Sequence, residues 1–168
     1  MTPPTLSTER LTLRPHLLAD YPAFRAFWMS DRAVHIGGPL KQDYEVWRQF
    51  AAEAGQWTLH GFGLWTVVSK AGDAVLGWVG LHHPPHYPAP ECAWHLTADA
   101  EGRGIGSEAA TAALAATLMA APLHAQAQTV WKASDVHPLG YPTVEAIQRM
   151  GKKLETATNG RIKIQMYP

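Results

Sequence analysis

The chain has 168 residues, the length of one domain that can bury a substantial hydrophobic core. Its 14 basic and 14 acidic side chains cancel, and no apolar run is long enough to span a bilayer, so the composition indicates neither a nucleic-acid surface nor a membrane protein. Cys92 is the only cysteine, which excludes a disulfide framework, and the N-terminus lacks the basic and apolar regions of an export signal; we therefore expect a cytoplasmic protein.

The chain begins with a predicted strand and a predicted helix. In residues 6–15, Leu11 and Leu13 alternate with polar neighbours, which is the period of a half-buried strand. Asp20 is expected to cap a helix that continues through Met29 and carries aromatic residues at helical spacing. These aromatic residues could line an acceptor pocket, although core packing is the more common reason for such a stripe.

A second helix and a hairpin follow. Residues 37–39 (Gly-Gly-Pro) break the chain, and a helix is expected over 43–54. β-Branched and aromatic residues over 62–68 and 75–81 predict two strands, and the turn at 69–73 contains a Gly-Asp pair that joins them. This is the clearest hairpin in the sequence.

The next segment, 82–90, contains four prolines and is expected to lack regular structure. It carries three histidines, which raise the question of a zinc site: His82, His83 and His86. They lie on a proline-rich loop rather than on one helix face, and no pair of cysteines accompanies them, so no metal site is expected. Residues 91–96 then form a further predicted strand.

The stretch after this strand is the most informative one in the chain. Gly102, Gly104 and Gly106 alternate with other residues where the strand gives way to an alanine-rich helical run. Glycine adopts positive φ without a Cβ penalty, so successive N–H groups can converge on an anion, and the N-terminus of the following helix adds its positive dipole. The loop therefore suits a pyrophosphate, but it lacks the Lys-Ser/Thr pair of nucleotide hydrolases and the position of a dinucleotide-binding turn.

This loop resembles the acyl-coenzyme A loop of the GNAT acetyltransferase superfamily, whose pattern is Gln/Arg-x-x-Gly-x-Gly/Ala. Residues 101–106 read Glu-Gly-Arg-Gly-Ile-Gly, with Glu101 departing from the first position. The run 8–14 (Thr-Glu-Arg-Leu-Thr-Leu-Arg) resembles the opening strand of the branch that acetylates ribosomal-protein N-termini and similar amines. The resemblance implies an α/β (α+β) fold, with a mixed central sheet flanked by helices, as a single acetyltransferase-like domain.

In function, the resemblance implies transfer of an acetyl group from acetyl-coenzyme A to a primary amine by direct attack. The acceptor is then a small-molecule amine or a protein N-terminus, and neither its identity nor the oligomeric state follows from the sequence. Backbone N–H groups of the loop would hold the pyrophosphate, and the strand edge would pair with the pantetheine amides. The implied cofactor-binding residues are Trp94, Leu96, Thr97, Gly102, Arg103, Gly104, Ile105, Gly106 and Ser107.

Three residues are candidates for proton transfer. Glu91 and His95 are the titratable groups on the strand that enters the loop, and strand alternation places them on the same face. The resemblance favours an acid here as the base for the amine, so Glu91 is preferred, although a solvent-facing carboxylate at a strand end is equally compatible with the pattern. Tyr141 is the candidate acid for the leaving thiolate, while a Tyr-Pro pair more often marks a turn.

The chain changes character after residue 108. Residues 109–123 carry no charge and are more than half alanine, and an Ala-x-Ala run follows, as in a secretory signal peptide. The sequence beyond it resembles the mature N-terminus of TRAP-type periplasmic dicarboxylate receptors. We therefore hypothesise a fusion with its junction near 108–113, between a native-looking front half, 1–110, and a foreign tail, 111–168.

The tail nevertheless has the element order that an acetyltransferase needs after its cofactor helix. A strand is expected over 129–134, a helix over 143–154 and a strand over 161–166. The tail could thus complete the sheet. The alternative to a working enzyme is an acyl-coenzyme A-binding or catalytically impaired hybrid.

Overall fold

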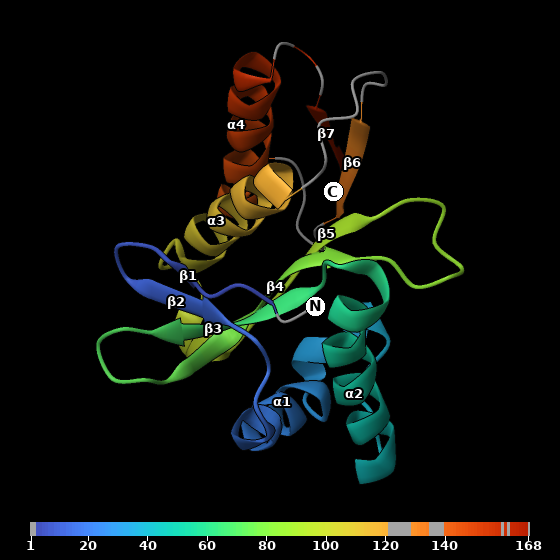
Figure 1. Ribbon diagram of the computed structural model, residues 1–168. Coiled ribbons are helices and arrows are strands. Elements are labelled where there is room, and N and C mark those ends of the chain that lie inside the picture. Colours follow the sequence, from blue (N-terminus) through green and yellow to red (C-terminus); the bar gives the residue numbers. More distant parts are fainter. Residues whose placement is uncertain (1–2, 121–128, 135–139, 159, 161, 168) are drawn as a thin grey trace.

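The computed structural model describes residues 3–120, 129–134, 140–158, 160 and 162–167 (Figure 1). Within these residues the strands form one mixed sheet of seven in chain order, antiparallel from the first to the fifth and parallel from there on. The strands are β1 (Leu6–Ser7), β2 (Leu11–Arg14), β3 (Leu64–Ser69), β4 (Val75–His82), β5 (Glu91–Leu96), β6 (Thr129–Ser134) and β7 (Ile162–Tyr167). The expected mixed sheet with flanking helices is confirmed.

Helices cover both faces of this sheet. The α-helices are α1 (Tyr21–Trp28), α2 (Asp43–His60), α3 (Ile105–Ala120) and α4 (Pro142–Ala157), and the short 3-10 helices are η1 (Leu18–Asp20), η2 (Asp31–Ile36) and η3 (Ala98–Ala100). α1 and α2 lie on one side of the sheet, and α3 and α4 lie on the other (Figure 1). An aromatic core including Phe24, Phe50 and Trp78 lies under α1 and α2, and an aliphatic core including Leu114 and Ile147 lies under α3 and α4.

Two local predictions in the front half are corrected. Asp20 does not cap α1 through its side chain; its carboxylate instead receives two 2.7 Å hydrogen bonds from the Arg14 guanidinium, a stronger partner than a backbone N–H. α2 continues past residue 54 to His60, because buried Trp57 packs in the core, and it ends at Gly61, whose φ is 74°. The hairpin of β3 and β4 is confirmed, and β5 has the predicted bounds.

The sheet is split between β5 and β6. These strands pair only at Glu91 with Lys132 and at Cys92 with Ala133, whereas β6 and β7 pair along six residues. β6 ends at Ser134, so the last residues of β5, Trp94 to Leu96, have no described strand partner on that side, and they line the cavity beside the glycine loop. This split positions the candidate site.

The second half of the chain completes the sheet. β6, α4 and β7 appear in the expected order, and Ile147, Met150 and Ile162 are buried in the same core as Leu114 of α3. The lack of charge in α3 after Glu108 fits its packing, since Ala109, Ala110 and Ala113 are buried. The predicted Ala-x-Ala segment at 121–127 lies outside the described residues.

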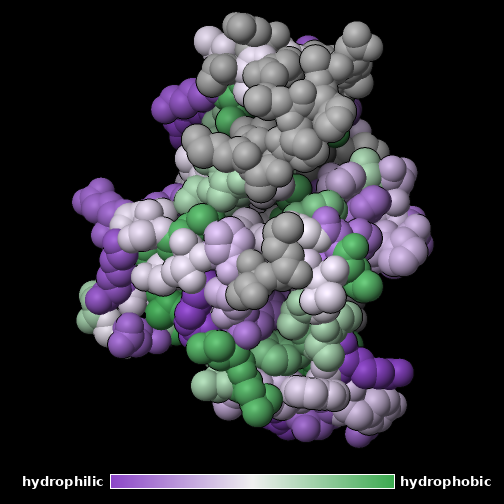
Figure 2. Space-filling view, in the orientation of Figure 1, coloured by the Kyte–Doolittle hydropathy of each residue, from purple (hydrophilic) through white to green (hydrophobic). Residues whose placement is uncertain are grey.

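The surface mixes polar and apolar side chains. In the space-filling view the two kinds are interspersed over the visible face (Figure 2). Among the described residues, no helix has the length and apolar character that crossing a membrane requires.

Candidate active site

A cavity of about 710 Å³ lies at the split in the sheet, a size that accommodates a large part of a cofactor. Its walls come from η2, the end of β5, the glycine loop, the start of α4 and the end of β7. The site residues predicted from sequence that line it are Trp94, His95, Leu96, Gly102, Gly104, Ile105, Gly106, Ser107 and Tyr141. Glu91, Thr97 and Arg103 are not among the lining residues.

The glycine loop has the backbone conformation expected for an anion site. Gly102 and Gly104 have φ values of 68° and 73°, in the left-handed region that favours glycine. At Gly104 a Cβ would approach only Arg10 Nη2, at 3.6 Å, so backbone conformation rather than lack of space selects glycine there. α3 begins at Ile105, whose side chain is buried in the core, and the N–H groups of the first turn point toward the loop.

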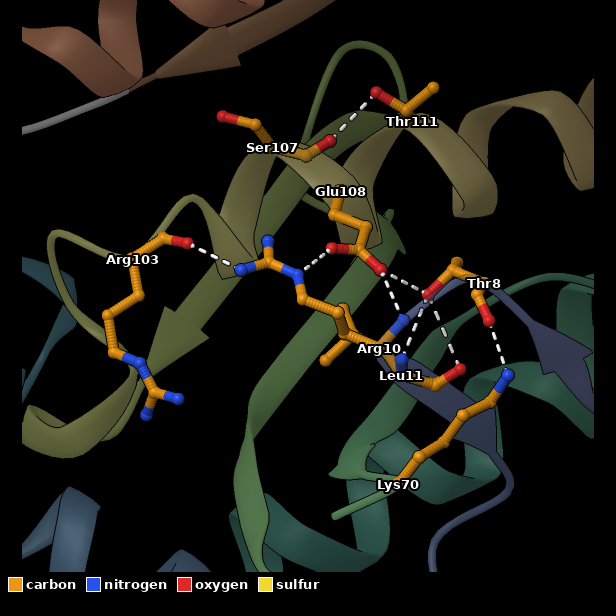
Figure 3. A network of polar contacts seen from close by, with 8 residues as sticks. All are labelled: Thr8, Arg10, Leu11, Lys70, Arg103, Ser107, Glu108 and Thr111. Carbon is orange, nitrogen blue, oxygen red and sulfur yellow. Dashed lines mark hydrogen bonds and ion pairs between the residues drawn. The ribbon is translucent and has the colours of Figure 1, made fainter.

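A polar network holds this loop against the β1–β2 turn (Figure 3). Arg10 Nη1 donates to the Arg103 carbonyl at 3.0 Å, and Arg10 Nε donates to Glu108 Oε2 at 2.6 Å. Glu108 Oε1 also accepts from the Arg10 backbone N–H at 3.0 Å and from the Thr8 hydroxyl. Arg10 and Glu108 thus fix the start of α3 and the loop together.

This network stabilises the ionised form of Glu108. Partial burial alone would raise the pKa of the carboxyl, but the hydrogen bonds from Thr8 and Arg10 outweigh burial and hold that pKa below its usual value. Because Thr8 and Arg10 lie about a hundred residues from Glu108 along the chain, local sequence motifs do not predict this contact.

Two of the predicted cofactor contacts point elsewhere in this structure. The Arg103 guanidinium donates to the Asp99 carbonyl at 2.8 Å, within its own loop. The Thr97 hydroxyl and backbone N–H both donate to the Leu76 carbonyl, at 3.2 and 3.0 Å, and tie Thr97 to β4. The loop therefore presents backbone rather than these side chains to the cavity.

Arg32 of η2 lies at the end of β5. Its Nε donates to the Leu96 carbonyl at 3.2 Å, and its Nη2 lies 3.1 Å from Glu101 Oε1. Glu101 is the position that departs from the Gln/Arg of the resembled motif, and here it pairs with a cation from the opposite wall of the cavity. No local sequence pattern points to Arg32, because it lies far from the loop along the chain.

The two titratable residues on β5 occupy different surroundings. They lie on the same face, as expected, since His95 pairs in register with Trp78 and Glu91 with His82. His95 lines the cavity and packs between Phe27 and Trp28, with ring centroids 5.6 and 5.5 Å apart. Glu91 lies at the other end of the strand.

Tyr141 lines the cavity from the start of α4. It has extended φ and ψ values of −72° and 142°, and Pro142 occupies the first position of the helix, so the Tyr-Pro pair starts a helix rather than forming a turn. In the described ranges, no three His, Cys, Asp or Glu side chains are placed to hold a metal ion.

Comparisons with known proteins agree with this geometry. The acetyltransferase (GNAT) domain family matches residues 10–148. An acetyltransferase from Agrobacterium tumefaciens str. C58 is 32% identical, with a match that covers 90% of this chain and 84% of that one at a TM-score of 0.71. A protein from Bordetella pertussis described as a GNAT-family acetyltransferase is 21% identical, covers 89% of this chain and 88% of that one, and has a TM-score of 0.67.

A more distant structure contains the cofactor. RimL, a ribosomal L7/L12 alpha-N-protein acetyltransferase solved in complex with coenzyme A, is 15% identical, covers 67% of each chain and has a TM-score of 0.55. At this identity the likeness concerns the fold alone. The family match runs without interruption through residues 108–113 to residue 148, so these comparisons do not support the hypothesised fusion with a TRAP-type receptor.

Proposed function

Since the chain belongs to the GNAT acetyltransferase family, we propose that it transfers the acetyl group of acetyl-coenzyme A to a primary amine by direct attack. The amine nitrogen forms a bond to the thioester carbonyl carbon, the C–S bond breaks, and the coenzyme leaves as a thiolate. The amine loses one proton and the thiolate gains one. A cytoplasmic location, expected from the single cysteine, is part of this proposal.

The glycine loop at the split in the sheet is the observation that carries the proposal. The N–H groups at 103–107 would hold the pyrophosphate at the N-terminus of α3, and the edge of β5 and the residue after it, over 94–97, would pair with the pantetheine amides. RimL, which shares the fold, was solved in complex with coenzyme A, which supports acetyl-coenzyme A as the ligand. Because Arg32 Nε donates a hydrogen bond to the Leu96 carbonyl, the pantetheine arm would displace that hydrogen bond or share its acceptor.

The proton-transfer roles fall to residues at the cavity or on its strand. His95 and Glu91 are the candidate bases for the amine, and Tyr141 is the candidate acid for the thiolate. The acceptor proposed is a protein N-terminus or a small amine. RimL and a ribosomal-protein-S5-alanine acetyltransferase from Vibrio fischeri share the fold, and their names point to protein N-termini.

Calorimetric titration with acetyl-coenzyme A tests the proposal. We expect micromolar binding to the wild-type chain and none to Gly104→Trp, because the large side chain would fill the loop at a position with φ of 73°. Gly72→Trp is the matched control, since Gly72 lies in an exposed turn where a Cβ meets nothing within 4 Å. Absence of binding to the folded wild-type protein would refute the proposal.

Turnover is measured by release of coenzyme A thiol in the presence of a peptide with a free N-terminal amine or of a polyamine. Thiol release that depends on the amine supports the enzyme. Binding without release across both acceptor classes would favour the alternative, a coenzyme A-binding protein with impaired catalysis.

A further inference from the structure

A fully buried carboxylate lies on the sheet face opposite α3. Glu53 of α2 has 0% exposure, on the side of the sheet where the core is mostly aromatic. Its Oε1 accepts from Gln49 Nε2 at 3.0 Å, and its Oε2 lies 3.8 Å from His16 Nε2 without a hydrogen bond. Burial of a carboxylate is costly unless it is compensated, so its presence here calls for a reason beyond packing.

The sheet brings His95 to the same interior. Thr66, Trp78 and His95 are register partners across β3, β4 and β5, so their side chains form one row on the face that α1 and α2 cover. Thr66 Oγ1 lies 3.0 Å from His16 Nδ1, which places His16 over this row as well. His95 is thus the member of the row that reaches both the interior and the cavity.

Several atoms of this group are buried without a hydrogen-bond partner among the described residues. They include Glu53 Oε2, His16 Nε2, Trp78 Nε1 and His95 Nδ1. Buried polar atoms are normally paired, so unpaired ones call for an explanation, and the titratable ones beside a cavity are candidates for proton transfer.

Burial and the charges around His95 act on its pKa in opposite directions. Burial lowers the pKa of His95, the Glu53 carboxylate opposes that change, and the imidazoles of His82 and His16 add to it. For Glu53, burial alone would raise the pKa, but the proximity of His16 and the charges of His95 and His16 outweigh burial and keep that pKa below its usual value. Burial thus favours the neutral form of His95, which can accept a proton, and the Glu53 carboxylate favours the form that has accepted it.

We propose that His95 is the general base of the acetyl transfer and that Glu53 is the positioning residue that stabilises its protonated form. The proposal rests on the function proposed above. During attack, the proton on the amine nitrogen moves to the His95 ring as the C–N bond forms and the C–S bond breaks, and the buried Glu53 charge compensates the imidazolium until the proton passes to solvent. Glu91 has no such access to the cavity.

Glu53→Gln separates this role from packing because it keeps the shape of the side chain and removes the charge. Histidine ring signals of the folded protein, followed by NMR between pH 4 and 9, report the His95 titration directly, and His95→Gln assigns the signal. We expect Glu53→Gln to move the His95 titration to lower pH, because the opposing carboxylate is gone. Glu9→Gln, at an exposed position, should leave it unchanged.

Kinetics with a peptide acceptor supply the second measurement. The acidic limb of kcat/KM should follow the His95 titration and shift with it in Glu53→Gln, while the KM for acetyl-coenzyme A stays the same. A general base contributes roughly 100-fold or more, so we expect His95→Gln to lower kcat by about that factor and Glu53→Gln by about tenfold. Glu53→Asp keeps the charge, so its His95 titration should lie closer to that of the wild type than to that of Glu53→Gln.

An unchanged His95 titration in Glu53→Gln would overturn the proposal, as would an acidic limb that persists in His95→Gln. If Glu53→Gln does not fold, Glu53→Met takes its place, because an apolar side chain of similar size removes the charge and suits a buried core. The His95 titration must then move to lower pH, or the proposal fails. The NMR titration does not depend on acetyl transfer. If the wild type fails to bind acetyl-coenzyme A, the proposed function is refuted, and the titration still shows whether Glu53 and His95 are coupled.

Discussion

Glu108→Ala tests whether the contact between α3 and the β1–β2 turn holds the glycine loop. The substitution removes three hydrogen bonds, from the Thr8 hydroxyl, the Arg10 backbone and the Arg10 guanidinium. A hydrogen bond to a charged group contributes about 1.5–3 kcal/mol, but the Arg10 side chain is 47% exposed, which reduces the ion-pair contribution. We expect a loss of about 2–3 kcal/mol, or about 4–12 °C in Tm for a domain of this size.

The effect must also depend on pH in a defined direction. Because the network holds the pKa of Glu108 below its usual value, its stabilisation is complete above the pKa of an unfolded glutamate and is lost as pH falls through the lowered pKa of the folded state. Thermal melts of wild type and Glu108→Ala should therefore converge on acidification. Glu9→Ala is the exposed control. A Tm difference below 1 °C at pH 7, or one that is constant with pH, would refute the reasoning.

Three further predictions concern the rest of the fold. Burial raises the pKa of the Cys92 thiol to about 12, so a thiol reagent at pH 8 should react only after denaturation; fast native labelling would contradict this. Asp20→Asn breaks the pair with Arg14 at a site 2% exposed and should cost about 3 kcal/mol in urea unfolding, unlike a surface substitution. Gly77→Ala would place a Cβ 2.1 Å from the His95 carbonyl, so we expect circular dichroism to show a Tm at least several degrees lower.

The elements set by local patterns could be predicted from the sequence. The hairpin of β3 and β4 follows from β-branched residues around a Gly-Asp turn, and β5 has the predicted bounds. The glycine loop was recognisable because a positive φ at Gly102 and Gly104 is a property of single residues. These features need no knowledge of distant contacts.

The elements that depend on distant partners were the ones missed. α2 continues beyond residue 54, its predicted end, and through Gly55. Beyond this glycine, Gln56 forms a hydrogen bond with His82, and Trp57 donates one to the Leu64 carbonyl. Asp20 was expected to cap a helix, but its carboxylate forms an ion pair with Arg14. The contacts of Arg32 and Arg10 with the loop likewise join segments that no local window contains.

Two described residue pairs join β5 to β6, and the shared core under α3 and α4 also connects these two units of the sheet. One unit runs from β1 to β5, and the other contains β6, β7 and α4. A cofactor arm hydrogen-bonded to the edge of β5 and in contact with α4 would act as an additional strand between the two units. Part of its binding free energy would then stabilise the junction between β5 and β6. Amide hydrogens of β6 and β7 would then exchange more slowly with solvent when the cofactor is bound, at positions remote from the pyrophosphate.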